Sequence, residues 1–233
     1  MKKARDSRSI SIAAISGALI LFVGTYLHPM DADPNDPLAA FTEYAGSRIW
    51  VAGHLLQLLG VMLILTAMIL LSRLIADGPA ASASILGALG ATASLAIAGA
   101  LQAVDGVALK SMVDRWASAT GNDKAMLFHA AFAVRQIEIG LASIASIVSG
   151  LTFSIYGAAI LIDRRFPVWL GALAILGGIL TAIAGVVIAY TGFSWLDMAI
   201  GMPANTLLLV WMVALGIYTW GARSDSEIVL DSH

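Results

Sequence analysis

The sequence predicts an all-α integral membrane protein, a single membrane domain with six transmembrane helices over residues 1–233. Hydrophobic residues make up 59% of the chain and charged residues 12%, whereas soluble domains carry about 25% charged residues. Six segments are long and apolar enough to cross a bilayer, which takes about 20 residues. The chain also lacks cysteine, which excludes disulfides, thiolate metal sites and thiol catalysis.

The predicted spans are separated by polar loops or short turns. In chain order they cover residues 9–27, 49–71, 82–104, 139–162, 168–190 and 204–220. The first span follows the basic segment MKKARDSR, as the apolar part of a signal peptide does. Its apolar stretch is long, however, and the following TYLHPMDA offers no cleavage site between small residues, so we expect a retained anchor.

Lysine and arginine near the span ends predict the orientation, because they are enriched in cytoplasmic loops. A cytoplasmic N-terminus puts eight of them inside, namely Lys2, Lys3, Arg5, Arg8, Arg73, Arg164, Arg165 and Arg223. Five then lie outside, namely Arg48, Lys110, Arg115, Lys124 and Arg135. We therefore expect a multi-pass protein of the plasma (inner) membrane. Its cytoplasmic parts are residues 1–8, 72–81, 163–167 and 221–233, and its outer loops are 28–47 and 105–127.

A two-helix unit occurs twice in the sequence. Shifting the chain by 87 residues aligns Asn35 with Asn122, Asp36 with Asp123, Phe41 with Phe128, Arg48 with Arg135, and Gly53 with Gly140. We interpret spans 2–3 and 4–5 as a duplicated hairpin with a pseudo-twofold axis along the membrane normal. These spans would form a four-helix core with spans 1 and 6 outside it. The alternative is that Ala, Gly, Ile and Leu are common enough to match by chance.

Small residues four apart predict where the second helix of each hairpin packs closely. The two pairs are Gly90 with Ser94 and Gly178 with Ala182. We expect helix packing there, because small side chains let backbones approach each other in lipid.

Polar residues near the outer ends of spans 2 and 4 predict a pocket. Trp50, His54 and Gln57 follow the spacing of one helix face, and exposing that face to lipid would be unfavourable. The runs 38–71 and 128–162 exceed the bilayer thickness, so both helices should project outward, with Pro37 in a first turn. The predicted ligand-binding residues are Arg48, Trp50, His54, Gln57, Arg135, Gln136 and Glu138.

Glu138 is the acid least expected at the top of an apolar span, and we expect it to pair with Arg135 or Arg48. The alternative is that both arginines anchor the helices at the membrane interface and that the pairing is structural. A carboxyl group in a partly dry pocket can also serve as a general acid, so Glu138 and Asp105 are candidate catalytic residues.

The segment GVALKSMVDRWASATGND, between spans 3 and 4, has the spacing of an amphipathic helix. Its apolar face would consist of Leu109, Met112, Val113 and Trp116. We expect a short helix on the outer surface that either covers the pocket or merely connects the spans.

The histidines do not predict a haem or metal site. When the two copies of the repeat are aligned, the positions of His129 and His54 differ by twelve residues, or about 18 Å along the helix. The two histidines should therefore not share an iron. A vestibule site with His28, His129, Glu43 or Asp123 lacks a metal-binding spacing such as HxxxH, and His233 lies in the tail. We therefore predict no metal site, and the sequence does not specify a cofactor.

Three functions agree with these features. The leading hypothesis is a binding or transport component whose outward-facing pocket holds a small amphipathic or anionic molecule. The second is a membrane-embedded enzyme that uses acid-base chemistry on a lipid-soluble, isoprenoid-like substrate. The third is an accessory subunit of a larger membrane complex, and the small size also fits a homodimer. The net charge of −2 argues against nucleic acid as a partner, because binding phosphates needs a basic surface.

Overall fold

The computed structural model describes residues 2–230, which contain helices and loops but no strand. The elements are α1 (Lys2–Tyr26), α2 (Pro37–Gly46), α3 (Trp50–Ile75), α4 (Ala81–Gln102), the π-helical η1 (Ala103–Leu109), α5 (Lys110–Ser118), α6 (Gly121–Asp163), α7 (Val168–Thr191) and α8 (Trp195–Leu230). Six helical segments are long and apolar enough to cross a membrane, as the sequence predicted.

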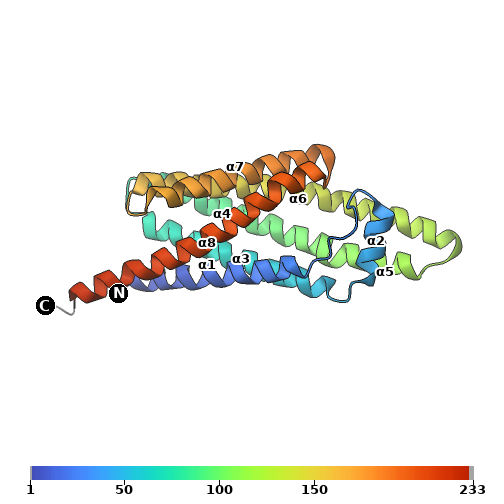
Figure 1. Ribbon diagram of the computed structural model, residues 1–233, viewed down its shortest axis with the longest axis horizontal. Coiled ribbons are helices and arrows are strands. Elements are labelled where there is room, and N and C mark those ends of the chain that lie inside the picture. Colours follow the sequence, from blue (N-terminus) through green and yellow to red (C-terminus); the bar gives the residue numbers. More distant parts are fainter. Residues whose placement is uncertain (1, 231–233) are drawn as a thin grey trace.

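The long helices form one elongated bundle (Figure 1). Each packs against two neighbours, in the closed order α1, α3, α4, α6, α7, α8 and back to α1. The start of α1 and the end of α8 lie at one end of the bundle, which we call the terminal end (Figure 1). We call the opposite end, with α2, α5 and the first turns of α6, the distal end.

The predicted four-helix core is not confirmed. In the ring α1 and α8 stand between α3 and α7, and both contribute to the central apolar cluster. Ile10 of α1 and Trp211 of α8 are fully buried there, and the Trp211 indole donates a hydrogen bond of 2.7 Å to the carbonyl of Leu170. The two outer helices are therefore part of the core, and the duplicated hairpin remains a prediction.

Small residues bring α6 and α7 into backbone contact. A Cβ atom on Gly150 would lie 2.5 Å from the carbonyl oxygen of Gly178 and 2.5 Å from the nitrogen of Ala182. A Cβ on Gly157 would lie 2.6 Å from the carbonyl of Gly171. The predicted close packing at Gly178 and Ala182 is therefore confirmed. It is also what lets apolar helices associate without a hydrophobic driving force between them.

The predicted continuous helix over 38–71 is wrong, because the chain breaks between Gly46 and Trp50. Asp36 caps α2 by accepting hydrogen bonds from the N–H groups of Leu38 and Ala39, and Pro37 lies in the first turn as predicted. Lys110 donates to the carbonyls of Tyr44 and Ala45 at the other end of α2. With both ends satisfied, α2 is an independent short helix that crosses the distal end (Figure 1).

The predicted amphipathic segment has the expected apolar face, with Leu109, Val113 and Trp116 buried. It does not form a separate surface helix, because α5 continues α4 through η1. The predicted excess length of the fourth span is confirmed, since α6 has 43 residues and a length of about 64 Å, while its outward direction stays a prediction. The extra turns of α6 support α5 and α2 above the bundle.

Candidate functional site

A cavity of about 310 Å³ opens at the distal end of the helix ring. Residues of α1, α2, α3, α4, η1, α6 and α8 line it, together with the loops that follow α1 and α7. Its polar lining includes Glu43, Gln57, Gln102, Asp105, Arg135 and Glu138. Its apolar lining includes Leu101, Ala142, Phe193, Met198 and Met202. The lining of the cavity is therefore of mixed polar and apolar character.

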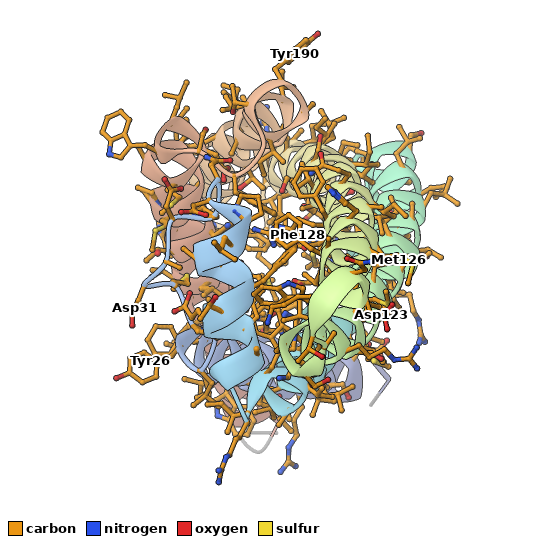
Figure 2. All side chains as sticks on the ribbon, turned by 90° about the vertical axis from the view of Figure 1, so that its right-hand side faces the viewer. Tyr26, Asp31, Asp123, Met126, Phe128 and Tyr190 are labelled. Atoms are coloured by element: carbon orange, nitrogen blue, oxygen red, sulfur yellow. The ribbon has the colours of Figure 1, made fainter. Side chains whose placement is uncertain are left out.

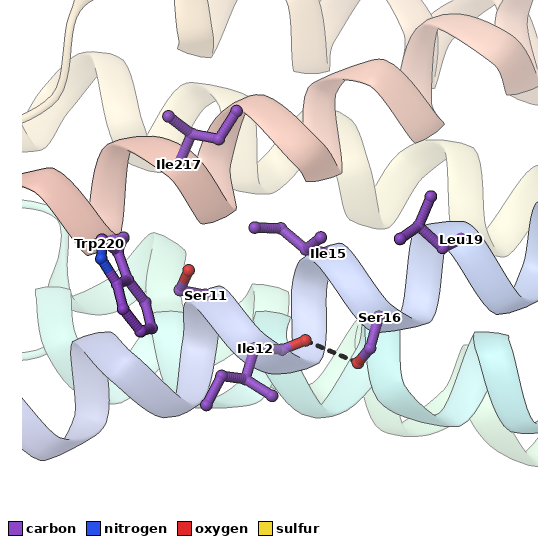
Figure 3. Close-up of a pocket in the computed structure, with 7 residues that line it drawn as sticks. All are labelled: Ser11, Ile12, Ile15, Ser16, Leu19, Ile217 and Trp220. Carbon is purple, nitrogen blue, oxygen red and sulfur yellow. Dashed lines mark hydrogen bonds between the residues drawn. The ribbon is translucent and has the colours of Figure 1, made fainter.

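A second hollow of about 490 Å³ lies between α1 and α8 and is almost wholly apolar (Figure 3). Ile12, Ile15 and Ile217 line it, and the hydroxyl of Ser16 donates to the carbonyl of Ile12 in its own helix. Among the residues that the structure describes, no charged side chain lines this hollow, so it offers a surface for acyl chains and little chemistry. The distal cavity is the candidate functional site.

Arg135 and Glu138 form a buried ion pair on one face of α6, three residues apart. Nη1 of Arg135 donates to both carboxylate oxygens of Glu138, at 2.7 and 2.8 Å. The guanidinium carbon lies 5.5 Å from the ring centre of Tyr44 and 4.8 Å from that of Phe193. The predicted pairing of Glu138 with Arg135 is confirmed. Of the three side-chain nitrogens of Arg135, Nη1 is the one that donates a hydrogen bond to a described residue. The other two nitrogens can therefore bind a guest.

His54 and Asp105 meet across α3 and η1. Nε2 of His54 lies 3.0 Å from Oδ2 of Asp105, and its Nδ1 lies 2.8 Å from the carbonyl oxygen of Trp50. The indole of Trp50 donates to the backbone carbonyl of Asp105 at 3.1 Å. Gly106 permits this approach, because a Cβ there would lie 2.6 Å from Cβ of His54.

His28 lies beside this pair, in the loop after α1. Its ring centre is 5.0 Å from that of His54 and 4.7 Å from that of Trp50. Burial lowers the pKa of His28, so its ring is neutral at pH 7 and keeps a free lone pair. Burial likewise raises the pKa of Tyr44 to about 12, so its hydroxyl stays protonated.

Two glutamines and the loop after α1 complete the site. Nε2 of Gln102 donates to Oε1 of Gln57 at 3.1 Å, which joins α4 to α3 within the cavity wall. The carboxylate of Glu43 accepts hydrogen bonds from the backbone N–H groups of Asp31 and Ala32, at 2.9 and 3.1 Å. These bonds hold the loop that carries His28 over the cavity.

The structure brings most of the predicted site residues together. Trp50, His54, Gln57, Asp105, Arg135 and Glu138 all lie in or directly beneath the cavity wall. Arg48 and Gln136 are instead exposed and outside the lining residues. Arg48 falls in the break between α2 and α3, and Gln136 is turned about 100° around α6 from Arg135.

The sequence did not predict the contributions of His28, Tyr44, Gln102 and Phe193 to this site. Gln102 had a usable signal, since it precedes Asp105 by one helical turn and is polar at the end of an apolar span. Tyr44 and Phe193 carry no such signal.

Three comparisons with known proteins provide no further information on the site. No protein-family model matches the sequence, and no curated protein and no solved structure matches the chain. The function therefore has to be inferred from the site itself.

Proposed function

We propose that the protein is a multi-pass membrane protein that binds a small amphipathic molecule in its distal cavity. The mixed polar and apolar lining of the cavity carries this proposal. Arg135, Glu138 and Asp105 supply charged groups to the lining, while Leu101, Met198 and Met202 supply apolar surface. Such a lining matches a guest with one polar and one apolar end, and methionine side chains adapt readily to the shape of an apolar guest.

Exposed aromatic residues support a position of the cavity at a membrane interface. Trp169 and Tyr190, 50% and 87% exposed, lie near opposite ends of α7, about 32 Å apart along the helix. This spacing matches the roughly 30 Å of bilayer hydrocarbon, and exposed Trp and Tyr prefer its boundaries. Tyr26 and Tyr190 both project away from the bundle in the view onto the distal end (Figure 2). The cavity lies near this boundary, where amphipathic molecules partition.

The charge of the cavity bears on the polar end of the guest. Glu43, Asp105 and Glu138 carry formal negative charges. Of the described arginine and lysine residues, Arg135 is the one that lines the cavity. Because Glu138 neutralises Arg135, the protein side chains alone favour a neutral or cationic polar end. An anionic guest, the other form that the sequence predicted, needs an additional positive charge in the cavity.

The test compares the molecules that co-purify with the wild-type protein and with two variants. The variant Arg135→Gln/Glu138→Gln removes both charges of the ion pair and avoids leaving one of them buried alone. The control Arg48→Gln removes an exposed arginine outside the cavity. We expect mass spectrometry of extracts from detergent-purified protein to find one amphipathic species with the wild type and the control, and at least tenfold less with the double variant. Equal amounts in all three would contradict the proposal.

A membrane-embedded enzyme is the second candidate function, and the contact between His54 and Asp105 favours it. A carboxylate that orients a histidine is a common arrangement for general acid-base catalysis. Of the two candidate catalytic residues, Asp105 would then orient His54, whereas Glu138 is held by Arg135 as an ion pair. The amphipathic species identified by mass spectrometry is the substrate to assay, and turnover that is lost in Asp105→Asn would favour this alternative.

An accessory subunit or a homodimer receives less support. The small residues that would form an interface with a partner are largely used inside the bundle, as at Gly150, Gly157 and Gly178. Gly99 and Gly140 are exceptions, since a Cβ on either would meet no atom within 4 Å.

A further inference from the structure

We propose that His28, His54 and Asp105 bind a divalent transition-metal ion at the floor of the distal cavity. One ligand atom from each residue lies within 4.8 Å of the other two. The three residues come from three separate segments, the loop after α1, α3 and η1. Two imidazoles and one carboxylate are a common ligand set for zinc and for non-haem iron. The sequence predicted no metal site, because no spacing along the chain connects these segments.

The hydrogen bonds of His54 require a cation between its ring and Asp105. A backbone carbonyl can only accept, so Nδ1 of His54 must donate its proton to the carbonyl of Trp50. In the neutral ring Nε2 then carries a lone pair, and it faces a carboxylate oxygen of Asp105 only 3.0 Å away. Two acceptors at this distance repel each other unless a proton or a metal ion lies between them.

The surroundings favour a metal ion. A hydrogen bond from the second ring nitrogen to a backbone carbonyl is the usual way in which proteins orient a metal-binding histidine. The other carboxylate oxygen of Asp105, Oδ1, is buried without a hydrogen-bond partner among the described residues. A carboxylate held only by an imidazolium would leave this oxygen unsatisfied, whereas a metal ion can bind both oxygens.

The geometry also indicates which part must move. Ligand atoms around a tetrahedral zinc ion lie about 3.3 Å apart, so Nε2 of His54 and Oδ2 of Asp105 are close to the required separation. His28 must approach, and it lies in a loop held by hydrogen bonds from Asp31 and Ala32 to the side chain of Glu43 rather than in a rigid helix. We therefore expect metal binding to draw this loop onto the cavity.

A metal ion with three protein ligands keeps a coordination position for a guest. His28 and Asp105 line the cavity, so the open position faces the space that the amphipathic molecule occupies. Only this role of the open position rests on the proposed function, and the metal site itself does not. Two added positive charges would offset the acidic lining and allow the guest to be an anion, such as a carboxylate or phosphate head group.

The experiment measures zinc binding by the full chain in detergent, purified through an affinity tag without histidine. The protein is stripped with EDTA, equilibrated with Zn²⁺, desalted and analysed for zinc per chain. We expect about one zinc ion in the wild type and in the control His129→Gln, which removes an exposed histidine of α6. We expect His28→Gln, His54→Gln and Asp105→Asn to weaken zinc binding about 100-fold or more.

Two outcomes would overturn the proposal. Zinc uptake by His28→Gln and Asp105→Asn equal to that of the wild type would overturn it. A folded wild type that takes up no zinc would also overturn it, and His54 would then be an imidazolium paired with Asp105. Should His54→Gln fail to fold, His28→Gln still gives a test, because His28 is a partly exposed loop residue. The double variant Arg135→Gln/Glu138→Gln should keep its zinc, so that loss of the amphipathic guest and loss of the metal can be told apart.

Discussion

The terminal and distal halves of the bundle use one ring of helices in two different ways. In the terminal half the ring is filled, with Leu71, Tyr156 and Met212 fully buried in the central cluster. Its polar groups include the hydroxyls of Ser72 and Tyr156, which bond to each other at 2.6 Å. In the distal half the ring encloses a cavity that Asp105 and Arg135 line, and Oδ1 of Asp105 is buried without a hydrogen-bond partner among the described residues.

This difference indicates which half provides stability and which provides function. Filling a ring with apolar side chains and closing it through glycine contacts gives a rigid base. Burying ionisable groups around a cavity lowers stability unless a guest or an ion compensates for it. The distal half therefore has the character of a binding site supported by the packed terminal half.

The largest expected effect comes from disturbing the packed half at Gly157. In Gly157→Leu the new side chain would meet the backbone of Gly171, which cannot move without separating α6 from α7. We expect a loss of more than about 3 kcal/mol in the free energy of unfolding, measured by thermal or denaturant unfolding in detergent. The matched control is Gly140→Leu, an open position in the distal half of the same helix. Equal destabilisation by both variants would contradict the proposed division of the bundle.

The next effect is expected at the buried ion pair of the distal half. Arg135→Gln leaves Glu138 buried without its cation and should destabilise the fold by about 3 kcal/mol. Arg135→Gln/Glu138→Gln should restore most of this loss, because two neutral amides can bond to each other. The measurement is a double-mutant cycle from unfolding in detergent. A double variant as unstable as Arg135→Gln would show that the pair contributes more than mutual neutralisation.

The sequence predicted well what depends on composition and on spacing within one helix. The apolar length of the spans predicted six membrane-crossing segments, and the three-residue spacing of Arg135 and Glu138 placed them on one face of α6. Contacts within a helix follow from its fixed geometry. The same geometry explains the buried face of α5 that carries Val113 and Trp116.

What the sequence did not predict depends on contacts between segments and on irregular backbone. Asp105 reaches His54 because η1 is a π-helix, whose register differs from that of the α-helix assumed for the span. His28 lies in a loop without periodicity, and the break before Trp50 has no proline to announce it. The aligned glycines also differ, since Gly53 lies near the carbonyl of Gly24 and Gly140 is open, so the duplication receives no support from packing.

Single cysteine substitutions at exposed positions are expected to have the smallest effect on the stability of the protein. They report which end of the bundle faces the outside. The chain has no cysteine of its own, and Asp33, Asp77, Asn122 and Arg164 are all exposed. Asp33, in the loop after α1, and Asn122, in the first turn of α6, lie at the distal end, while Asp77 and Arg164 belong to loops at the terminal end (Figure 1). At Arg164, which has a φ of 60°, cysteine adds no new steric strain because arginine already carries a Cβ there.

We expect an impermeant maleimide to label intact cells at positions 33 and 122 only, and all four positions after the cells are opened. This result follows from the excess of lysine and arginine near the terminal ends of the spans, and it would place the cavity on the outer face. Labelling at position 77 in intact cells would show that the orientation is the opposite of the predicted one. The packed half and the cavity would keep their roles in that case, but the guest and the metal ion would then have to come from the cytoplasm.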